Sequence, residues 1–364
     1  MLSQLKGYTK YIIFFLQLIL KAAQNNYSKR KLSDSIYVFI NKNPYHRYLT
    51  NLVFYFSEYG CNVNIKCSSY MLRDLDPYSK KIFDLPNVSL TLCKPNSRHQ
   101  LVLTTDSSVQ KGVFLDPDYF SYNKTSTVYS VPIGMHPLMY INRYYQNISL
   151  ENIKEVRNIP ILFAGNASEE HYDNPVLMNH FNVISRSKVI NFLKSSNSIK
   201  TFYPQNLNDF HNTYKPQSVL INEINTFKIP IDHFLDILTR TNFFLALPGV
   251  TMPLSHNVIE AMACGCIPIL QFNHLMSPPL EHNKNCIKFN LLSELQTIIE
   301  DIESLSPDEI MRMRNNVINY YQKHLTTQAI ASDIINHCKS DNSILLNAEY
   351  HSVDLLVNQP KTYN

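Results

Sequence analysis

Short apolar segments alternate with helical stretches along most of this 364-residue chain, and this alternation limits the fold more than any other feature. Segments rich in β-branched and aromatic residues are typical of strands, and strands that alternate with helices are typical of parallel βα units. The predicted strands cover 35–41, 62–66, 87–92, 100–104 and 129–133 in the first half, and 160–164, 199–203, 218–222, 243–247 and 267–271 in the second. We therefore expect an α/β protein built on parallel sheets.

The domain organisation follows from where this pattern stops and restarts. Helices are predicted at 45–59, 185–193, 231–239 and 255–264, and a capping box with proline at the first helical position opens another helix at 306. The polar segment 142–157 lacks periodicity. We expect two facing Rossmann-like domains with an interdomain cleft. Their predicted ranges are 32–145 and 159–340, with an arm at 1–31, a linker at 146–158 and a tail at 341–364.

Composition excludes several classes of protein. Hydrophobic residues make up 45% of the chain and charged residues 17%, which excludes a largely disordered chain. No apolar run reaches the 18 to 20 residues of a spanning helix. The seven cysteines are odd in number and form no CxxC pair, so neither a zinc framework nor a disulfide scaffold is expected. Free thiols favour a reducing compartment such as the cytoplasm.

The basic charge is concentrated at the start of the chain. Residues 1–35 hold six lysines and arginines against Asp34 alone, so the rest of a chain of net charge +4 is nearly neutral. This distribution does not suit a nucleic-acid binder, which spreads cations over a folded face. A largely apolar run at 11–20 lies between the lysines. It fits a helix docked on an anionic membrane surface, a buried N-terminal helix or, less well because of Lys21 and Gln17, a signal peptide.

The chain has only seven glycines, and three of them mark junctions in the second half. Gly165 follows the predicted strand 160–164, and Gly249 follows the strand 243–247. Parallel sheets bind ligands at the carboxyl ends of their strands, and glycine lets a ligand approach the backbone closely. Gly265 is better explained as the C-terminal cap of the helix before it.

The segment 249–260 (GVTMPLSHNVIE) contains the densest group of candidate binding residues. Ser255 can cap the helix that begins there, and helix N-termini attract anions such as a diphosphate. Glu260 lies in the second turn, where its carboxylate can accept hydrogen bonds from ribose hydroxyls. A capped helix that only packs its apolar residues into the core is the competing interpretation, and this holds for Ile259, Met262 and Ala263.

The segment 243–270 resembles the C-terminal signature of exostosin-like glycosyltransferases, and weaker similarity extends over about 159–335. The matching residues are Pro248, Gly249, Ser255, Glu260, Gly265, Cys266, Ile267 and Pro268. IPILFAGNA at 159–167 resembles the first C-terminal strand of that family, with Gly165 and Asn166 at the phosphate end. Arg186 resembles the arginine that binds the donor phosphates.

The resemblance implies a GT-B fold in which the second domain binds a nucleotide-sugar and the first holds the acceptor. An arginine usual in the family is absent from the helix that starts at Ser255, where His256 and Asn257 stand instead, so the donor is not specified. Residues and resemblance together give the expected donor-binding set of Gly165, Asn166, Arg186, Pro248, Gly249, Ser255, His256, Asn257 and Glu260.

An inverting transfer needs a base that takes the proton of the acceptor hydroxyl. We expect that base in the first half, facing the donor. Asp106 follows the strand 100–104 and is the first candidate, ahead of His46 at the start of the first helix and His136 near the domain junction.

Metal is not expected, because the helix terminus, backbone amides and Arg186 can meet the charge of a leaving diphosphate. Two D-x-D tripeptides, at 74–76 and 116–118, keep a metal-dependent glycosyltransferase open. A nucleotide-sugar epimerase and a catalytically silent glycan-binding subunit also fit the same fold. The favoured function is transfer of a sugar from a nucleotide-sugar to a cell-surface glycan such as a polysaccharide, a lipopolysaccharide or a capsule. The expected location is the cytoplasm or the cytoplasmic face of the inner membrane.

Overall fold

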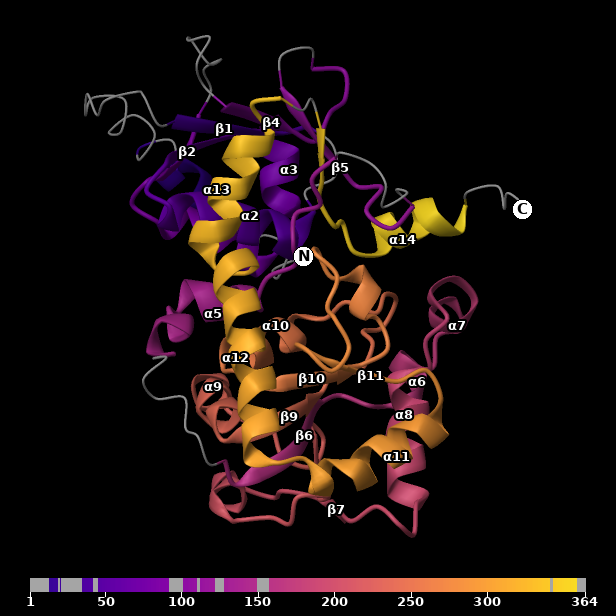
Figure 1. The fold of residues 1–364 in the computed structure, drawn as a ribbon. Coiled ribbons are helices and arrows are strands. Elements are labelled where there is room, and N and C mark those ends of the chain that lie inside the picture. Colours follow the sequence, from indigo (N-terminus) through magenta and orange to yellow (C-terminus); the bar gives the residue numbers. More distant parts are fainter. Residues whose placement is uncertain are drawn as a thin grey trace, which may run out of the picture. The chain divides into compact units, whose positions relative to one another are not determined.

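The computed structural model describes residues 13–18, 20, 35–41, 45–91, 101–109, 112–121, 128–148, 157–340 and 343–358, apart from the side chains of residues 46, 69 and 74. The chain forms two compact units. Unit 1 comprises Met1–Val131 and Thr327–Leu355, and unit 2 comprises Pro132–Thr326 and Leu356–Asn364. Each unit contains a six-stranded parallel sheet with helices packed on it, which confirms the predicted α/β class with two Rossmann-like units (Figure 1).

Unit 1 is built around the sheet β12-β5-β4-β1-β2-β3. Read from β3 to β12, the strands follow the 3-2-1-4-5-6 order of the Rossmann fold. The strands are β1 (Ser35–Ile40), β2 (Asn62–Cys67), β3 (Val88–Leu90), β4 (Leu101–Thr104), β5 (Val113–Asp116) and β12 (Ser343–Leu345). The helices are α2 (His46–Glu58), α3 (Ser69–Asp74), α4 (Pro77–Lys81), α13 (Thr327–His337) and most of α14 (Tyr350–Val357). Helix α13 packs against α2.

Unit 2 is built around the sheet β11-β10-β9-β6-β8-β7. Its strands are β6 (Ile159–Gly165), β7 (Thr201–Phe202), β8 (Val219–Glu223), β9 (Thr241–Leu245), β10 (Ile267–Leu270) and β11 (Ile287–Lys288). Its helices are α5 (Pro137–Ile141), α6 (Glu169–Tyr172), α7 (Pro175–Phe181), α8 (Arg186–Ser195), α9 (Ile231–Thr239), α10 (His256–Ala263), α11 (Leu292–Asp301) and α12 (Pro307–His324). Strands β6 and β10 are buried along almost their whole length, as expected for a parallel sheet covered on both faces.

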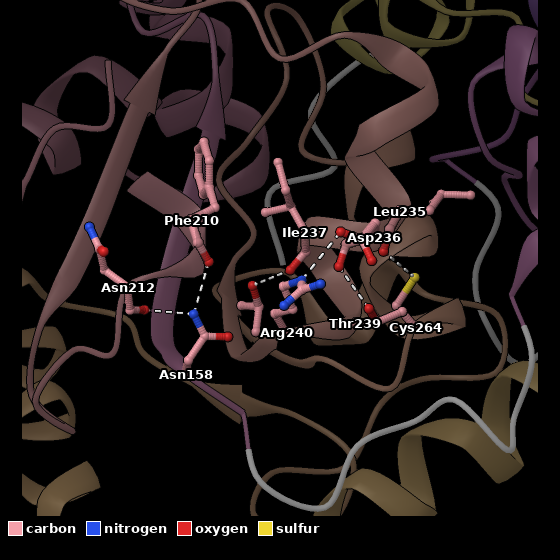
Figure 2. A network of polar contacts seen from close by, with 10 residues as sticks. Asn158, Phe210, Asn212, Leu235, Asp236, Ile237, Thr239, Arg240 and Cys264 are labelled. Carbon is pink, nitrogen blue, oxygen red and sulfur yellow. Dashed lines mark hydrogen bonds and ion pairs between the residues drawn. The ribbon is translucent and has the colours of Figure 1, made fainter. Parts of the chain in front are cut away.

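The amino edge of the second sheet is held by polar groups that bond to the backbone. The guanidinium of Arg157 is buried and donates to the carbonyl oxygens of Thr241 (2.5 Å) and Cys264 (2.8 Å). Figure 2 shows Asn158 donating to the carbonyls of Phe210 and Asn212, at 2.8 and 2.6 Å. These side chains bond to backbone acceptors and so hold the chain at this edge of the sheet.

Most of the predicted elements are present, but the structure also differs from the prediction. The segment 129–133 is not a strand: Ser130 forms only an isolated bridge with Leu345. Strand β9 begins two residues earlier than predicted. The elements that were not predicted are the strands β5, β11 and β12 and the helices α3, α4, α5, α6, α7, α11, α13 and α14. The capping box at Ser306 and Glu309 is confirmed by both of its reciprocal hydrogen bonds.

The unit boundaries also differ from the expected domains. The first domain was expected to end at 145, but the chain enters unit 2 at Pro132, because α5 buries Met139 and Tyr140 there. The expected tail at 341–364 instead supplies β12, which completes the first sheet beside β5. Most of the expected linker, 149–156, lies outside the described residues, as does most of the arm at 1–31.

The described part of the arm, residues 13–18 and 20, is helical. Leu18 is buried, and the ring of Phe14 meets that of Phe83 edge-on, with centroids 6.3 Å apart. Ile13, Leu16 and Leu20 are more than half exposed. Among the described residues, no helix has the length and hydrophobicity needed to cross a bilayer.

Candidate functional site

The site lies where the strand order of the second sheet reverses direction. Strand β6 pairs with β9 on one side and with β8 on the other; β7 lies beyond β8, and β10 and β11 lie beyond β9. Ligands of open parallel sheets bind outside the carboxyl ends of the strands at such a switch point. The turns after β6 and β9 carry Gly165 and Gly249, so the structure places both predicted glycines at this edge.

Gly165 ends β6 in a conformation that favours glycine, with φ at +153°. A Cβ atom there would lie 3.2 Å from Nη1 of Arg186 and 3.7 Å from Nδ2 of Asn257. The Asn257 amide donates to the carbonyl of Ala164 at 3.1 Å, which ties the first turn of α10 to the end of β6. Gly249 is also constrained, because a Cβ atom would lie 2.8 Å from the carbonyl oxygen of Met252.

Arg186, the first residue of α8, joins the two turns. Its Nε donates to the carbonyl of Pro248 at 2.9 Å, its Nη1 to the carbonyl of Asn166 at 2.9 Å, and its Nη2 to the carbonyl of Leu247 at 3.3 Å. The guanidinium stacks 4.2 Å from the centroid of the Tyr172 ring.

The charge of Arg186 has no carboxylate partner among the described residues, although the side chain is only 5% exposed. Burial lowers the pKa of Arg186 to about 10, and the nearby Tyr172 hydroxyl partly opposes that shift. The guanidinium therefore stays protonated at neutral pH and is compensated only by carbonyl dipoles and an aromatic face. A buried cation in this state favours the approach of an anion.

The N-terminus of α10 adds a second source of positive potential. Ser255 stands at the N-cap with extended backbone, but its hydroxyl makes no capping hydrogen bond, so the prediction that Ser255 caps this helix is wrong. The half-buried hydroxyl is therefore not engaged in holding the helix. Backbone N–H groups of a first helical turn point toward an anion placed at the terminus.

Glu260 lies one turn further along α10 and is 2% exposed. Its Oε1 accepts the backbone N–H of His136 at 2.9 Å. Burial raises the pKa of Glu260 to about 8, and the His136 hydrogen bond lowers it in part. The carboxyl group is therefore largely protonated at neutral pH, which differs from the carboxylate expected from the sequence.

His136 is placed differently from expectation. It was predicted to lie in the first half as a candidate base, but it belongs to unit 2, where it caps α5 and meets α10. Its ring lies edge-on to the ring of His256, with centroids 4.9 Å apart. The structure therefore brings His136 together with the predicted donor-binding residues, which all lie at the carboxyl edge of the second sheet: Gly165, Asn166, Arg186, Pro248, Gly249, Ser255, His256, Asn257 and Glu260.

The two remaining candidate bases lie in unit 1. Asp106 follows β4 at its carboxyl end, as predicted, and its Oδ1 accepts the backbone N–H of Ser108 at 3.0 Å and the Ser108 hydroxyl at 2.7 Å. This arrangement is an Asx turn. His46 opens α2, and its side chain lies outside the described residues.

The two D-x-D tripeptides have local structural roles. Asp76 caps α4 by accepting the N–H of Ser79 at 2.8 Å, and Asp116 accepts the N–H of Asp118 at 2.9 Å. The side chain of Asp74 lies outside the described residues. Over the part of the chain that the structure describes, no three histidine, cysteine, aspartate or glutamate side chains cluster as a metal site would require. Metal independence stays a prediction.

Two features of the site were not found from the sequence. Tyr172 stacks on Arg186 from α6, and no sequence spacing signals that contact. The contact of His136 with α10 is the second: Pro137 directly after His136 is typical of a helix start, but no local signal places that helix against α10. The short helix α5 then carries His136 to α10.

We predict that Glu260 makes unit 2 less stable as pH rises. Because the pKa of the folded carboxyl, about 8, is above its ordinary value of 4.5, its contribution to stability is complete below pH 4.5 and is lost as pH rises through 8. Glu260→Gln cannot ionise and keeps an oxygen for the His136 N–H. Urea denaturation at pH 5.5 and 8.5 should show a smaller loss of unfolding free energy in Glu260→Gln than in the wild type. Equal losses in both proteins would contradict the assignment.

Comparisons with known proteins give structural likeness but no sequence relative. No protein-family model matches the sequence, and no curated protein matches it. The chain is similar to the solved structure of Anabaena Alr3699/HepE in complex with UDP, with a TM-score of 0.45 and 10% identity over 84% of this chain and 100% of that chain. It is similar to the N-terminal domain of Candida albicans trehalose-6-phosphate phosphatase, with a TM-score of 0.45 and 9% identity over 86% and 98% of the two chains. The calicheamicin glycosyltransferase CalG4 gives a TM-score of 0.32 and 8% identity over 85% and 99%. At these TM-scores the likenesses carry no argument about activity.

Proposed function

We propose that unit 2 binds the diphosphate of a nucleotide-sugar and that the chain is a glycosyltransferase. The observation that supports this most is the buried guanidinium of Arg186, placed at the switch point of a parallel sheet without a carboxylate partner among the described residues. The N-terminus of α10 lies at the same edge, joined to β6 through Asn257. A cation and a helix terminus side by side suit a ligand with two adjacent negative groups.

Two turns without a side chain let that ligand come close to the backbone. The turn at Gly165 and the turn at Gly249 both exclude a side chain, and Arg186 fixes them relative to each other through carbonyls on both. A preorganised cradle of this kind stabilises the charge that develops on a leaving diphosphate, with little reorganisation at the moment of transfer. This chemistry requires no metal ion, and we propose a metal-independent transfer.

The finer assignments are proposals that rest on the sequence. The segment 243–270 resembles exostosin-like enzymes, which implies a GT-B enzyme with its nucleotide-sugar in the second domain. We propose an inverting transfer to a cell-surface glycan. The acceptor would be held by unit 1, with Asp106 ahead of His46 as the base. An epimerase or a silent binding subunit would share the nucleotide site, and transfer to an added acceptor separates the glycosyltransferase from both.

We predict that Ser255→Ala weakens binding of the donor without destabilising the protein. The Ser255 hydroxyl caps nothing, so its loss should leave the free energy of unfolding unchanged. A hydrogen bond to a charged phosphate contributes about 1.5–3 kcal/mol, so affinity should fall by roughly tenfold or more. The measurement is calorimetric titration with whichever of UDP, GDP, CDP and CMP most stabilises the wild type in a thermal-shift panel.

The matched control for Ser255 is Ser306, which also stands at a helix N-cap in unit 2. Its hydroxyl accepts the N–H of Glu309 at 3.2 Å within a full capping box. Ser306→Ala should lose about 1 kcal/mol of stability and keep the affinity of the wild type. A Ser255→Ala protein that binds the nucleotide as tightly as the wild type would remove Ser255 from the site, and a wild type that binds none of the four would refute the proposed function.

We also propose that the N-terminal helix rests on an anionic membrane surface. Ile13, Leu16 and Leu20 follow a helical spacing that puts them on one face, and all three are more than half exposed. Phe14 and Leu18 take the opposite side, which packs on unit 1. Among the described residues, the second apolar side of this helix is not covered. The six flanking cations favour an anionic lipid surface for it.

We predict that replacing Leu16 and Leu20 by serine abolishes vesicle binding without destabilising the fold. Full burial of a leucine contributes about 1.5–3 kcal/mol, so each should be worth about tenfold in affinity. Sedimentation with phosphatidylglycerol-containing vesicles should recover the wild type at low salt and less of it at high salt. Leu18→Ser is the control: it should destabilise unit 1. Equal vesicle binding by the wild type and the double variant, or none by the wild type, would contradict the proposal.

A further inference from the structure

Two histidines and a glutamate meet on one face of α10. His256 and Glu260 are four residues apart, so their side chains share that face. His136 meets both: its backbone N–H donates to Glu260 Oε1 at 2.9 Å, and its ring lies edge-on to His256 with the centroids 4.9 Å apart. The contact fixes the start of α5 against the first two turns of α10.

The orientation of the His136 ring is defined by its own helix cap. Its Nδ1 accepts the backbone N–H of Leu138 at 3.2 Å. An imidazole nitrogen that accepts a hydrogen bond carries no proton, so the neutral ring holds its proton on Nε2. His136 is therefore a donor at Nε2 in its neutral form, and the Leu138 N–H fixes the orientation of its ring.

Glu260 brings no fixed negative charge to this cluster. Glu260 is largely protonated at neutral pH because of its burial, so it does not neutralise a cation on either imidazole. His256 is the first residue of α10. The next residue, Asn257, donates to the carbonyl oxygen of Ala164 near the carboxyl end of β6. The pair of rings thus stands at the N-terminus where the diphosphate is proposed to bind, where anions are favoured.

We propose that His136 and His256 form an imidazole pair that binds the donor diphosphate, with His136 donating from Nε2. This inference rests on the proposed function, and it gives unit 2 a residue that the sequence had assigned to the acceptor half. The histidines take the place of the arginine that the resemblance leads one to expect in α10. They supply hydrogen bonds to phosphate oxygens without adding a permanent buried charge beside Arg186.

His136→Asn separates the two roles of this residue. An asparagine at the N-cap can accept the Leu138 N–H through its Oδ1, and the backbone N–H to Glu260 is kept, so α5 should stay capped. The imidazole Nε2–H is lost. His136→Ala loses both the cap and the donor. The unfolding free energy should therefore stay unchanged in His136→Asn and fall in His136→Ala.

The binding probe is inorganic pyrophosphate, which reports on the phosphate site without a choice of base or sugar. Calorimetric titration of the full chain should give at least a tenfold weaker affinity for His136→Asn and for His256→Gln. The fold-loss of affinity in the double variant should be smaller than the product of the two single fold-losses, because the residues act as a pair. His233→Asn, at an exposed position of α9 in the same unit, should bind like the wild type.

The outcomes separate this inference from the proposed function. If pyrophosphate binds the wild type and His136→Asn equally while Ser255→Ala is weakened, the diphosphate site stands and the histidine pair is refuted. A His136→Asn protein that binds weakly but is also as destabilised as His136→Ala would show a structural role only. If neither pyrophosphate nor any nucleotide binds the wild type, the proposed function fails first.

Discussion

The fork of hydrogen bonds from Arg186 is the interaction on which the site depends. It joins the turn after β6 to the turn after β9 through the carbonyls of Asn166 and Pro248, both at 2.9 Å. These turns follow two adjacent parallel strands of the sheet. Because Gly165 has no Cβ atom, the guanidinium of Arg186 can lie close to the backbone there. An arginine is suited to this task because its planar group offers several donors in fixed directions.

The electrostatics of the site follow from the burial of one basic group, Arg186, and one acidic group, Glu260. Arg186 keeps its charge when buried, because carbonyl dipoles and the Tyr172 ring surround it. Glu260 loses its charge when buried, because only one backbone N–H reaches it. The edge of the sheet is left with net positive potential from the cation and the end of α10. Negative charge from a ligand would complete this balance, and a nucleotide-sugar carries that charge in its diphosphate.

The sequence predicted most of the strands and the glycines at the carboxyl edge of the second sheet, because both depend on local signals. Apolar strands, a capping box and a glycine after a strand can be seen in short stretches, and β6, α10, α12 and Gly165 lie where they were expected. It could not place His136 or β12, since both depend on contacts between segments far apart: His136 with Glu260, and β12 with β5. The hydroxyl of Ser255 was misjudged for a different reason. Serine is favoured at a helix N-cap, but the hydroxyl of Ser255 makes no capping hydrogen bond, and residue type alone does not predict this.

Hydrogen–deuterium exchange of the full chain, with and without UDP, GDP, CDP or CMP, tests the central claim most directly. If the diphosphate of the donor lies between the turn after β6, the turn after β9 and α10, one nucleotide should slow exchange of backbone amides in 165–168 and 249–260. Amides of the amino edge around Asn158 and Thr241 should be unaffected. Protection confined to unit 1, or to that amino edge, would contradict a diphosphate site at the carboxyl ends of the second sheet.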